Sequence, residues 1–530
     1  MAPRSIRWFV AGSGMALLFI GCSSSTEPVE SVAPELTAFS LSRGVNPSLP
    51  AGLVGEIRGD TIRLVTPSVI AVDSLVPTFA ANDSEVTVRV GTAVQRSGQT
   101  AVNFTAPVTY TVVARSGAER RYVVDVVVFT GLPVITITTD GGAPILTRED
   151  YVNATIDVYG GKSRPEWSSR STTQIRGRGH STWYAPKKPY RLKLTTSAAM
   201  FGFPADRDWA LLANYWDLSL ARNALGFEFS REAGMAYTPR CTPVELVLNG
   251  THQGAYQLCE HQEVATNRIP AGSAGWHLEL TSFRRLKSDE VYFPTPLVSQ
   301  YSQEWGTSVW VYKQPDPPSE AQRATIEAQM LRAETVLYGA GFAHPDTGYA
   351  ALFDVESVID WYLVMELAKN NDATFFNGVK IYRTATGKIT FGPVWDFDLA
   401  FGRFGFDSAP TGWRIRNAAW IERFFDDRVF INRLKVQWQA LYTKRATFDT
   451  YVRNYAQQVF LSQRLSHSKW SPYEPTPTLR LDEVMFPLPQ VRQLDRDALF
   501  TDADYTAEIT ALRTWLDARW AWLNTAIMDL

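Results

Sequence analysis

The chain has 530 residues, a formal net charge of −2 and 45% hydrophobic residues. At about 100–200 residues per domain this length predicts more than one domain, and the apolar fraction excludes a wholly disordered chain. The balance of 52 basic against 54 acidic residues gives no support for a nucleic-acid-binding protein or a polybasic membrane-binding protein.

The first residues have the order of a bacterial export signal. Two arginines precede an apolar stretch from 8 to 20, which is shorter than the roughly 20 residues of a transmembrane helix. Cleavage after Gly21 would expose Cys22, and the run LFIGC resembles a lipobox, whose cysteine becomes lipidated. We predict a signal peptide at 1–21, a flexible tether at 22–34, and an extracytoplasmic lipoprotein anchored to a membrane, the outer membrane or the cell surface. A plain secretory signal with an incidental cysteine is the alternative.

Residues 35–130 contain short β-rich runs that are separated by turn residues. The runs are LTAFSL, TIRLV, EVTVRVGTAV, VTYTVVA and RYVVDVVV, and no helix-period stretch interrupts them. This spacing is typical of a β-sandwich. The segment resembles the Ig-like modules that stand between lipid anchor and effector domain in bacterial surface lipoproteins. We predict an all-β Ig-like sandwich that serves as a spacer or docking module.

From 131 to 530 the pattern changes to mixed α and β, which predicts an α+β domain and a multidomain chain. Strand-like runs are VITITTD, TIDVYGG, TTQIRGRG and YRLKLTT. Apolar residues at helical spacing predict helices over 218–233, 319–338, 355–369 and 507–526. Arg519 interrupts the apolar face of the last of these helices once.

The two cysteines other than Cys22 flank a predicted hairpin. Asn249-Gly250 is a type I′ turn signal between alternating apolar runs, which places Cys241 nearly opposite Leu258 and one position from Cys259. A disulfide in an oxidising compartment and two free buried cysteines both fit this arrangement.

A loop with two glycines joins two predicted strands between 174 and 194. Gly177 and Gly179 lie in the loop, and alternation puts Arg191 and Lys193 on one face of the second strand. Glycines let backbone N–H groups approach a phosphate closely, and a basic side chain on the returning strand can neutralise it. The segment therefore predicts a phosphate-binding loop.

A stronger catalytic pattern lies between 370 and 398. Asp372 and Asn377 have the D-x-x-x-x-N spacing of a protein-kinase catalytic loop, and a hairpin later Asp396-Phe397 stands where kinases have the metal-binding Asp-Phe-Gly. One carboxylate would accept the proton of the attacking hydroxyl, while an amide and a second carboxylate would hold Mg²⁺ against the phosphates. Two solvated acidic loops beside a hairpin are the non-catalytic alternative.

Four motifs resemble, in this order, the spore-coat protein H (CotH) family. They are RGRGHSTWYAPKKPYRLKL, WALLANYWDLSLARNALGFEFSREAG, VELVLNGTHQGAYQLCE and NNDATFFNGVKIYR…FGPVWDFDLAFG, and the similarity covers about residue 132 to the C-terminus. That family has an atypical protein-kinase-like fold and is known for ATP-dependent protein phosphorylation. The resemblance therefore implies an atypical kinase-like domain over 131–530 that uses ATP and Mg²⁺ or Mn²⁺.

The resemblance also implies roles for single residues. Asp372 would be the catalytic base, Asp396 the principal metal ligand and Asn377 a second ligand. Asp398 would either join the metal site or cap the following turn. The nucleotide-phosphate contacts would come from three basic residues of the first motif. Lys188 lies in its loop, and Arg191 and Lys193 lie on the strand that follows.

The predicted function is transfer of the γ-phosphoryl group of ATP to Ser/Thr hydroxyls of a protein substrate at the cell surface. The chain lacks the His-Arg-Asp, Val-Ala-Ile-Lys and full G-x-G-x-x-G motifs of ordinary kinases, and His180 stands where the family usually has Asn. A prediction of another class is a non-catalytic surface binding or structural protein, an adhesin or coat-like component, on a kinase-like scaffold. A phosphotransferase that acts on a small molecule or glycan would use the same motif residues.

Overall fold

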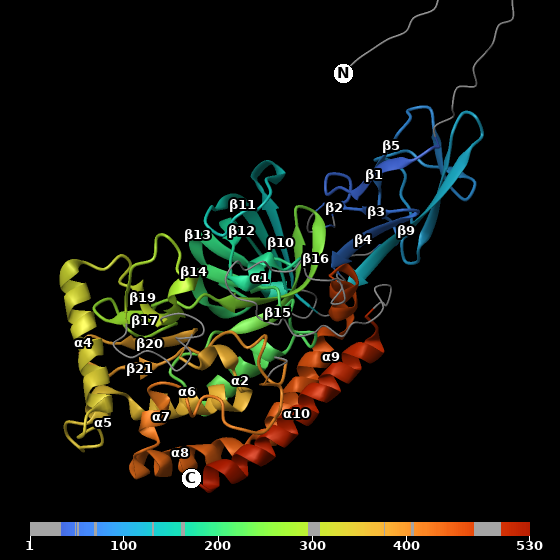
Figure 1. The fold of residues 1–530 in the computed structure, drawn as a ribbon. Helices are drawn as coiled ribbons and strands as arrows, with labels where there is room; N and C mark the ends of the chain where they lie inside the picture. Colours follow the sequence, from blue (N-terminus) through green and yellow to red (C-terminus); the bar gives the residue numbers. More distant parts are fainter. Residues whose placement is uncertain are drawn as a thin grey trace, which may run out of the picture.

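The computed structural model describes residues 33–530 except for 48, 50–51, 68–71, 130–131, 161–164, 295–307, 376, 404–406 and 471–499. The predicted signal peptide and the lipidation site Cys22 lie outside the described residues. An all-β N-terminal region is followed by an α+β region, which confirms the predicted multidomain organisation (Figure 1). Within the described part, no helix combines the length and apolar character that a membrane crossing requires.

The N-terminal region consists of two β-sheets around one core. One sheet has the order β2-β1-β5, and the other has the order β3-β4-β9-β8-β6-β7, in which β4 and β9 are parallel. Phe39 and Tyr110, from different sheets, meet edge to face with ring centroids 5.2 Å apart. The strands are β1 (Leu36–Leu41), β2 (Leu53–Val54), β3 (Glu56–Arg58), β4 (Thr61–Pro67), β5 (Thr78–Ala81), β6 (Thr87–Val90), β7 (Ala93–Val94), β8 (Val108–Val113) and β9 (Glu119–Phe129).

A closed barrel opens the α+β region. Its strand order is β10-β11-β12-β13-β14-β16-β15, and parallel pairing of β15 with β10 closes it. Alternate residues such as Ile175, Leu192 and Trp209 are fully buried and fill the interior, so the barrel is a packed core. The strands are β10 (Val134–Thr139), β11 (Val152–Tyr159), β12 (Ser169–Gly177), β13 (Tyr190–Met200), β14 (Phe203–Leu212), β15 (Cys241–Leu248) and β16 (Thr251–Glu260).

The β15–β16 hairpin turns where the sequence predicts. Asn249 and Gly250 have φ values of 49° and 76°, as a type I′ turn requires. A β-bulge after Leu246 shifts the pairing by one residue, so Cys241 lies opposite Cys259 and the predicted pairing with Leu258 is wrong. Both cysteines are free thiols in this structure, and their oxidation to a disulfide stays a prediction.

The second half of the α+β region combines a five-stranded sheet with helices that cover it and the base of the barrel (Figure 1). The sheet order is β18-β19-β17-β20-β21. Its strands are β17 (Trp276–Ser282), β18 (Tyr292–Pro294), β19 (Ser308–Gln314), β20 (Val379–Arg383) and β21 (Thr390–Phe391). The helices are α1 (Ser181–Tyr184), α2 (Arg222–Ala233), α4 (Glu320–Tyr338), α5 (Tyr349–Leu352), α6 (Val355–Ala368), α7 (Ile421–Phe424), α8 (Arg428–Thr443), α9 (Arg445–Lys469) and α10 (Asp502–Met528).

The predicted helices are present, with different boundaries at two of them. α4 begins after Ser319, which forms a capping box, and α6 ends close to the predicted residue. α2 begins four residues later than predicted, because Leu220 has a left-handed backbone with φ 58° and ends the preceding turn. α10 begins five residues earlier than predicted, at a capping box formed by Thr501. Helices α8 and α9 were not predicted.

Candidate functional site

The loop that carries Asp372 starts at the end of α6. The helix stops because Lys369 has a left-handed backbone, with φ 50°. The next side chain, Asn370, is hydrogen bonded in two directions: its Oδ1 accepts the N–H of Asp372 at 3.1 Å, and its Nδ2 donates to the carbonyl of Asp396 at 2.9 Å. One buried amide therefore fixes the two predicted acidic loops relative to each other.

Asn377 closes the loop that Asp372 opens. Its backbone N–H donates to the carbonyl of Asp372 at 3.3 Å, and its Oδ1 accepts the hydroxyl of Thr281 on β17 at 2.9 Å. The D-x-x-x-x-N spacing thus corresponds to one closed turn. The amide oxygen of Asn377 retains a second lone pair, so the contact with Thr281 does not prevent metal ligation.

Helix α2 supports the Asp396 loop from behind. Asp396 has φ 68°, which is uncommon for a residue other than glycine and is a strained conformation often found at functional sites. The N–H of Phe397 donates to Oδ1 of Asn223 at 2.9 Å. The Phe397 ring packs so closely on Gly226 that a Cβ there would lie 2.3 Å from it. A glycine of α2 therefore makes room for the loop.

Asp372, Asp396 and Asp398, which we call the acidic trio, influence one another. Burial raises the pKa of Asp398 well above its ordinary value, and the carboxylates of Asp396, Asp372 and Asp217 and a hydrogen bond with Asp396 raise it further. Asp398 is 8% exposed, so water compensates little of this repulsion.

Burial raises the pKa of Asp372 to about 6. The guanidinium groups of Arg285 and Arg414 oppose the increase, and the carboxylate of Asp396 adds to it. Within the described residues, no member of the acidic trio has an ion-pair partner. The carboxylates of the trio repel one another electrostatically, and hard oxygen ligands of this kind suit Mg²⁺ or Mn²⁺. By chemical type these donors therefore fit the divalent cation that the sequence predicts, although the oxygens of all three do not lie within 4.8 Å of one another as those of the group described next do.

A second acidic group, not singled out in the sequence, lies on the barrel side. Carboxylate oxygens of Asp206, Asp208 and Glu263 lie within 4.8 Å of one another. Arg191 pairs with Asp208 at 2.6 Å, and Arg268 pairs with Asp206 at 3.1 Å and with Glu263 at 2.6 Å. Two guanidinium groups thus neutralise most of the charge of this Arg-paired cluster, which therefore does not need a metal ion.

The glycine loop has packing reasons for its two glycines. A Cβ on Gly177 would lie 2.3 Å from the Trp183 ring, and Gly179 has φ 81°. The N–H of Gly177 donates to the carbonyl of Thr147 at 2.9 Å, and the N–H of Arg178 donates to that of Pro189 at 3.1 Å. The phosphate-binding role predicted for Gly177 therefore cannot depend on its N–H group, whereas Gly179 keeps that possibility.

The three basic residues predicted to contact phosphate differ in whether they have protein partners. Arg191 is held by Asp208, and Nζ of Lys188 donates to the carbonyl of Trp183 at 2.7 Å. Lys193 lies on the same outward face of β13 as Arg191, as alternation predicts. Lys193 makes no hydrogen bond or ion pair among the described residues, so it is the most available phosphate contact of the three.

Two cations that sequence reasoning missed meet at Trp395, next to Asp396. The guanidinium of Arg178 lies 5.1 Å from the Trp395 ring centroid, and Nζ of Lys380 lies 5.7 Å from it. Lys380 also pairs with Glu279 at 3.6 Å. Both were visible in the motifs, since Arg178 is the middle residue of G-x-G and Lys380 lies on the strand between the two acidic loops. The positive charge of these two residues, more than the glycines of the loop, indicated which side chains lie near Asp396.

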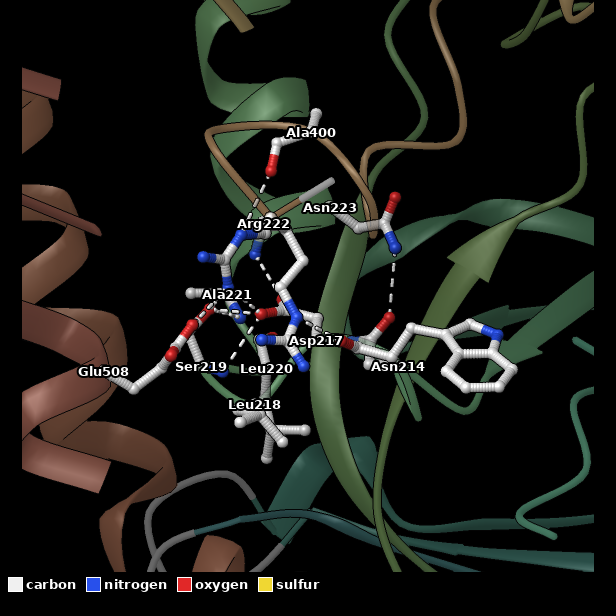
Figure 2. Close-up of polar contacts among 12 residues, drawn as sticks. Asn214, Asp217, Leu218, Ser219, Leu220, Ala221, Arg222, Asn223, Ala400 and Glu508 are labelled. Atoms are coloured by element: carbon white, nitrogen blue, oxygen red, sulfur yellow. Dashed lines mark hydrogen bonds and ion pairs between the residues drawn. The ribbon is translucent and has the colours of Figure 1, made fainter. Parts of the chain in front are cut away.

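Arg222 has a structural role beside the candidate site. Figure 2 shows its guanidinium between Asp217 at 2.5 Å and Glu508 of α10 at 2.8 Å. Its Nε donates to the carbonyl of Ala400 at 3.2 Å. This buried network connects α2 and α10 to the backbone just after the acidic trio. Glu260 is also structural, because it is buried and pairs with Arg240 at 2.8 Å.

Comparisons with known proteins agree with the sequence motifs. A search of curated proteins finds no match. A solved structure from Bacteroides thetaiotaomicron, described as a candidate glycoside hydrolase, is 19% identical to this chain, with a TM-score of 0.16. The match covers 40% of this chain and 41% of that structure, so this chain spans about two fifths of the length of that protein. The family model "SGBP, N-terminal" matches residues 48–126. The model of the CotH kinase protein family matches residues 175–523, which is more than half of the chain. The chain therefore belongs to the CotH kinase protein family.

Proposed function

We propose that this chain is an atypical kinase, dependent on Mg²⁺ or Mn²⁺, that transfers the γ-phosphoryl group of ATP to Ser or Thr hydroxyls of a protein substrate. The acidic trio carries the proposal, because its carboxylates interact electrostatically, form no ion pair among the described residues, and include the first residue of a closed D-x-x-x-x-N turn. Membership of the CotH kinase family supports the same activity.

In the proposed reaction, a substrate hydroxyl attacks the γ-phosphorus of ATP, the bond to ADP breaks, and the hydroxyl proton passes to Asp372. Asn370 holds Asp372 in place through its backbone N–H. Asp396, Asp398 and Asn377 would hold the metal ion, which when bound neutralises phosphate charge.

Basic side chains on both sides of the acidic trio would stabilise the charge of the transferred group. Lys193 lies on the barrel, Arg178 lies in the glycine loop, and Lys380 lies on β20 of the second sheet. Because Arg178 and Lys380 approach the same tryptophan from different parts of the fold, ATP phosphates near Asp396 would face two cations.

The proposal is tested by transfer of ³²P from γ-labelled ATP to dephosphorylated casein with Mg²⁺ or Mn²⁺. Wild type is compared with Asp396→Ala and with Asp206→Asn, a control in the Arg-paired cluster. We expect incorporation with wild type and the control and none with Asp396→Ala. Equal incorporation by all three would reject the role of Asp396. A wild type that neither transfers phosphate nor binds nucleotide would reject the kinase.

A non-catalytic surface protein on the same scaffold is the second candidate. One observation favours it: two of the three predicted phosphate contacts, Arg191 and Lys188, are occupied by protein partners. A thermal-shift assay with ATP and Mg²⁺ separates the candidates, since a nucleotide site stabilises the fold by about 2.7 kcal/mol at a hundredfold excess over Kd. An unchanged melting temperature would support the scaffold.

We also propose that the mature chain is attached to a membrane through a lipid on Cys22, outside the cytoplasm. The support is the apolar stretch followed by LFIGC and a flexible tether. Radiolabelled palmitate should enter the wild-type chain and not a Cys22→Ser variant, which should leave the membrane fraction. Equal labelling of both would reject the lipid anchor at this residue.

A further inference from the structure

Residues 407–416, which follow the acidic trio, are held by a buried carboxylate. Glu366 of α6 is 1% exposed, and its two oxygens accept the backbone N–H groups of Arg414, Ile415 and Arg416 at 2.8, 2.8 and 2.9 Å. Three successive N–H groups directed at one anion define a fixed turn. The turn is therefore ordered by a side chain of the domain itself.

Arg519 of α10 completes this arrangement from the other side. It is fully buried, and its Nη2 donates to Oε1 of Glu366 at 2.7 Å. Its Nη1 donates to the carbonyls of Gly412 at 2.8 Å and Pro410 at 3.0 Å. Arg519 thus binds both the carboxylate and the segment that the carboxylate holds.

Lys369 supplies the third buried charge. It is 4% exposed, and its Nζ donates to the carboxylate of Asp407 and to the carbonyls of Ala409 at 2.9 Å and Thr411 at 2.8 Å. The adjacent Asn370 is the residue that fixes the two acidic loops. The end of α6 therefore holds residues 407–416 and the acidic trio as one unit.

In protein kinases, the segment that follows the metal-binding Asp commonly becomes ordered when an added phosphate pairs with arginines. Here a carboxylate and its arginine partner provide the same kind of charge pair, and both are part of the fold. We propose that Glu366, Lys369 and Arg519 are positioning residues that order residues 407–416 beside Asp372 without an activating modification. The catalytic part of this inference rests on the proposed kinase function, whereas the ordering is independent of it.

Hydrogen–deuterium exchange on the whole mature protein tests the ordering. The wild type should protect the amides of 414–416, Glu366→Gln should increase their exchange rate at least tenfold, and Lys369→Met should do so for 407–412. Lys444→Met is the matched control, because Lys444 also donates to a backbone carbonyl, that of Glu232 at 2.8 Å, at another place in the fold. Unchanged protection in both test variants would overturn the proposal. Lys369→Met is the milder change, since it leaves the buried Glu366–Arg519 pair intact.

Steady-state phosphorylation of dephosphorylated casein tests the catalytic part. Treatment of the wild type with a phosphatase, verified by mass spectrometry, should change the rate less than twofold. Lys369→Met should raise the KM for casein at least tenfold and leave the Kd for ATP·Mg²⁺ within twofold, and Lys369→Arg should restore part of the loss. Loss of wild-type activity on phosphatase treatment would overturn the positioning role. An increase of both the KM for casein and the Kd for ATP·Mg²⁺ in Lys369→Met would overturn it as well. A wild type without transfer would reject the kinase function and this catalytic part, while the exchange data would still decide the ordering.

Discussion

Among the described residues of the domain, two groups of three carboxylates differ in how their charge is compensated. In the Arg-paired cluster, Asp206, Asp208 and Glu263 share two guanidinium groups at 2.6–3.1 Å. In the acidic trio, no member forms an ion pair among the described residues, and the carboxylates of its neighbours raise the pKa of Asp398. Proximity of acidic residues alone therefore does not identify a metal site in this fold.

The difference follows from the elements that carry the two groups. Asp208 is paired across strands with Lys193 in β13 and lies near Arg191, so the barrel surface supplies cations from neighbouring strands. The acidic trio lies on two irregular loops that are fixed by amides and backbone groups, which carry no charge. Arg285 and Arg414 act on Asp372 without an ion pair among the described residues, so a bound metal ion would add positive charge to the trio.

The largest expected effect is on the rate of phosphate transfer, which should depend on the acidic trio far more than on the Arg-paired cluster. Asp372→Asn should reduce phosphate transfer at least about a hundredfold, because the amide cannot accept the hydroxyl proton. Asp208→Asn should retain measurable transfer, since Asp208 contacts a guanidinium group rather than the reacting atoms. Initial rates at saturating ATP and casein measure both. A greater loss for Asp208→Asn would contradict the comparison.

Stability should change in opposite directions in the two groups. Asp208→Asn should lower the free energy of unfolding by about 2 kcal/mol, because it leaves Arg191 without its partner. Asp398→Asn should raise it by about 1 kcal/mol in EDTA, because an amide relieves the repulsion among buried carboxylates. Both side chains come from residues that are 8% exposed, so burial does not explain the difference. Guanidinium unfolding followed by tryptophan fluorescence gives both values, and changes of the same sign would refute the assignment.

The Arg-paired cluster should make the free energy of unfolding depend on pH through Glu263. Burial raises the pKa of Glu263 from 4.5 to about 7, with Asp208 adding to the increase and Arg268 opposing it. The folded state then binds the proton more tightly than the unfolded state, so this contribution is present below pH 4.5 and is lost as pH rises to about 7. Relative to Glu263→Gln, wild type should lose on the order of 2 kcal/mol across this range. The free energies of unfolding of wild type and Glu263→Gln are measured at pH 5, 6 and 7. A difference between the two proteins that does not change with pH would contradict the raised pKa of Glu263.

The smallest effect concerns the basic residues beside the two groups. Lys193→Met should weaken ATP·Mg²⁺ binding about tenfold, or about 1.4 kcal/mol, because Lys193 has no protein partner among the described residues. Lys188→Met should change binding less, because its Nζ is occupied by the carbonyl of Trp183. Isothermal titration gives both constants. The reverse order would place the nucleotide phosphates nearer to Lys188.

Local patterns predicted much of the fold. The Asn249-Gly250 turn, the outward face of Arg191 and Lys193, and the helix that follows Ser319 all depend on neighbours within a few residues. The register error at Cys241 came from a bulge, which leaves no simple signature in an alternating strand. The parallel pairing that closes the barrel joins strands about 110 residues apart, so no local pattern contains it.

The candidate site divides in the same way. The turn from Asp372 to Asn377 could be predicted from spacing, because it is short and closed by one hydrogen bond. The position of Arg178 over Trp395 could not, since it depends on how the barrel meets the second sheet. The metal, nucleotide and catalytic roles of the predicted residues remain predictions.

The buried Arg519 also has a consequence for the order of events during synthesis. It binds Glu366, which precedes it by 153 residues, and no other described side chain takes both the carboxylate and the carbonyls of Pro410 and Gly412. A nascent chain that has already produced Asp372 and Asp396 still lacks this arginine. The site is therefore expected to reach its final form only after α10 has been translated and docked against α6.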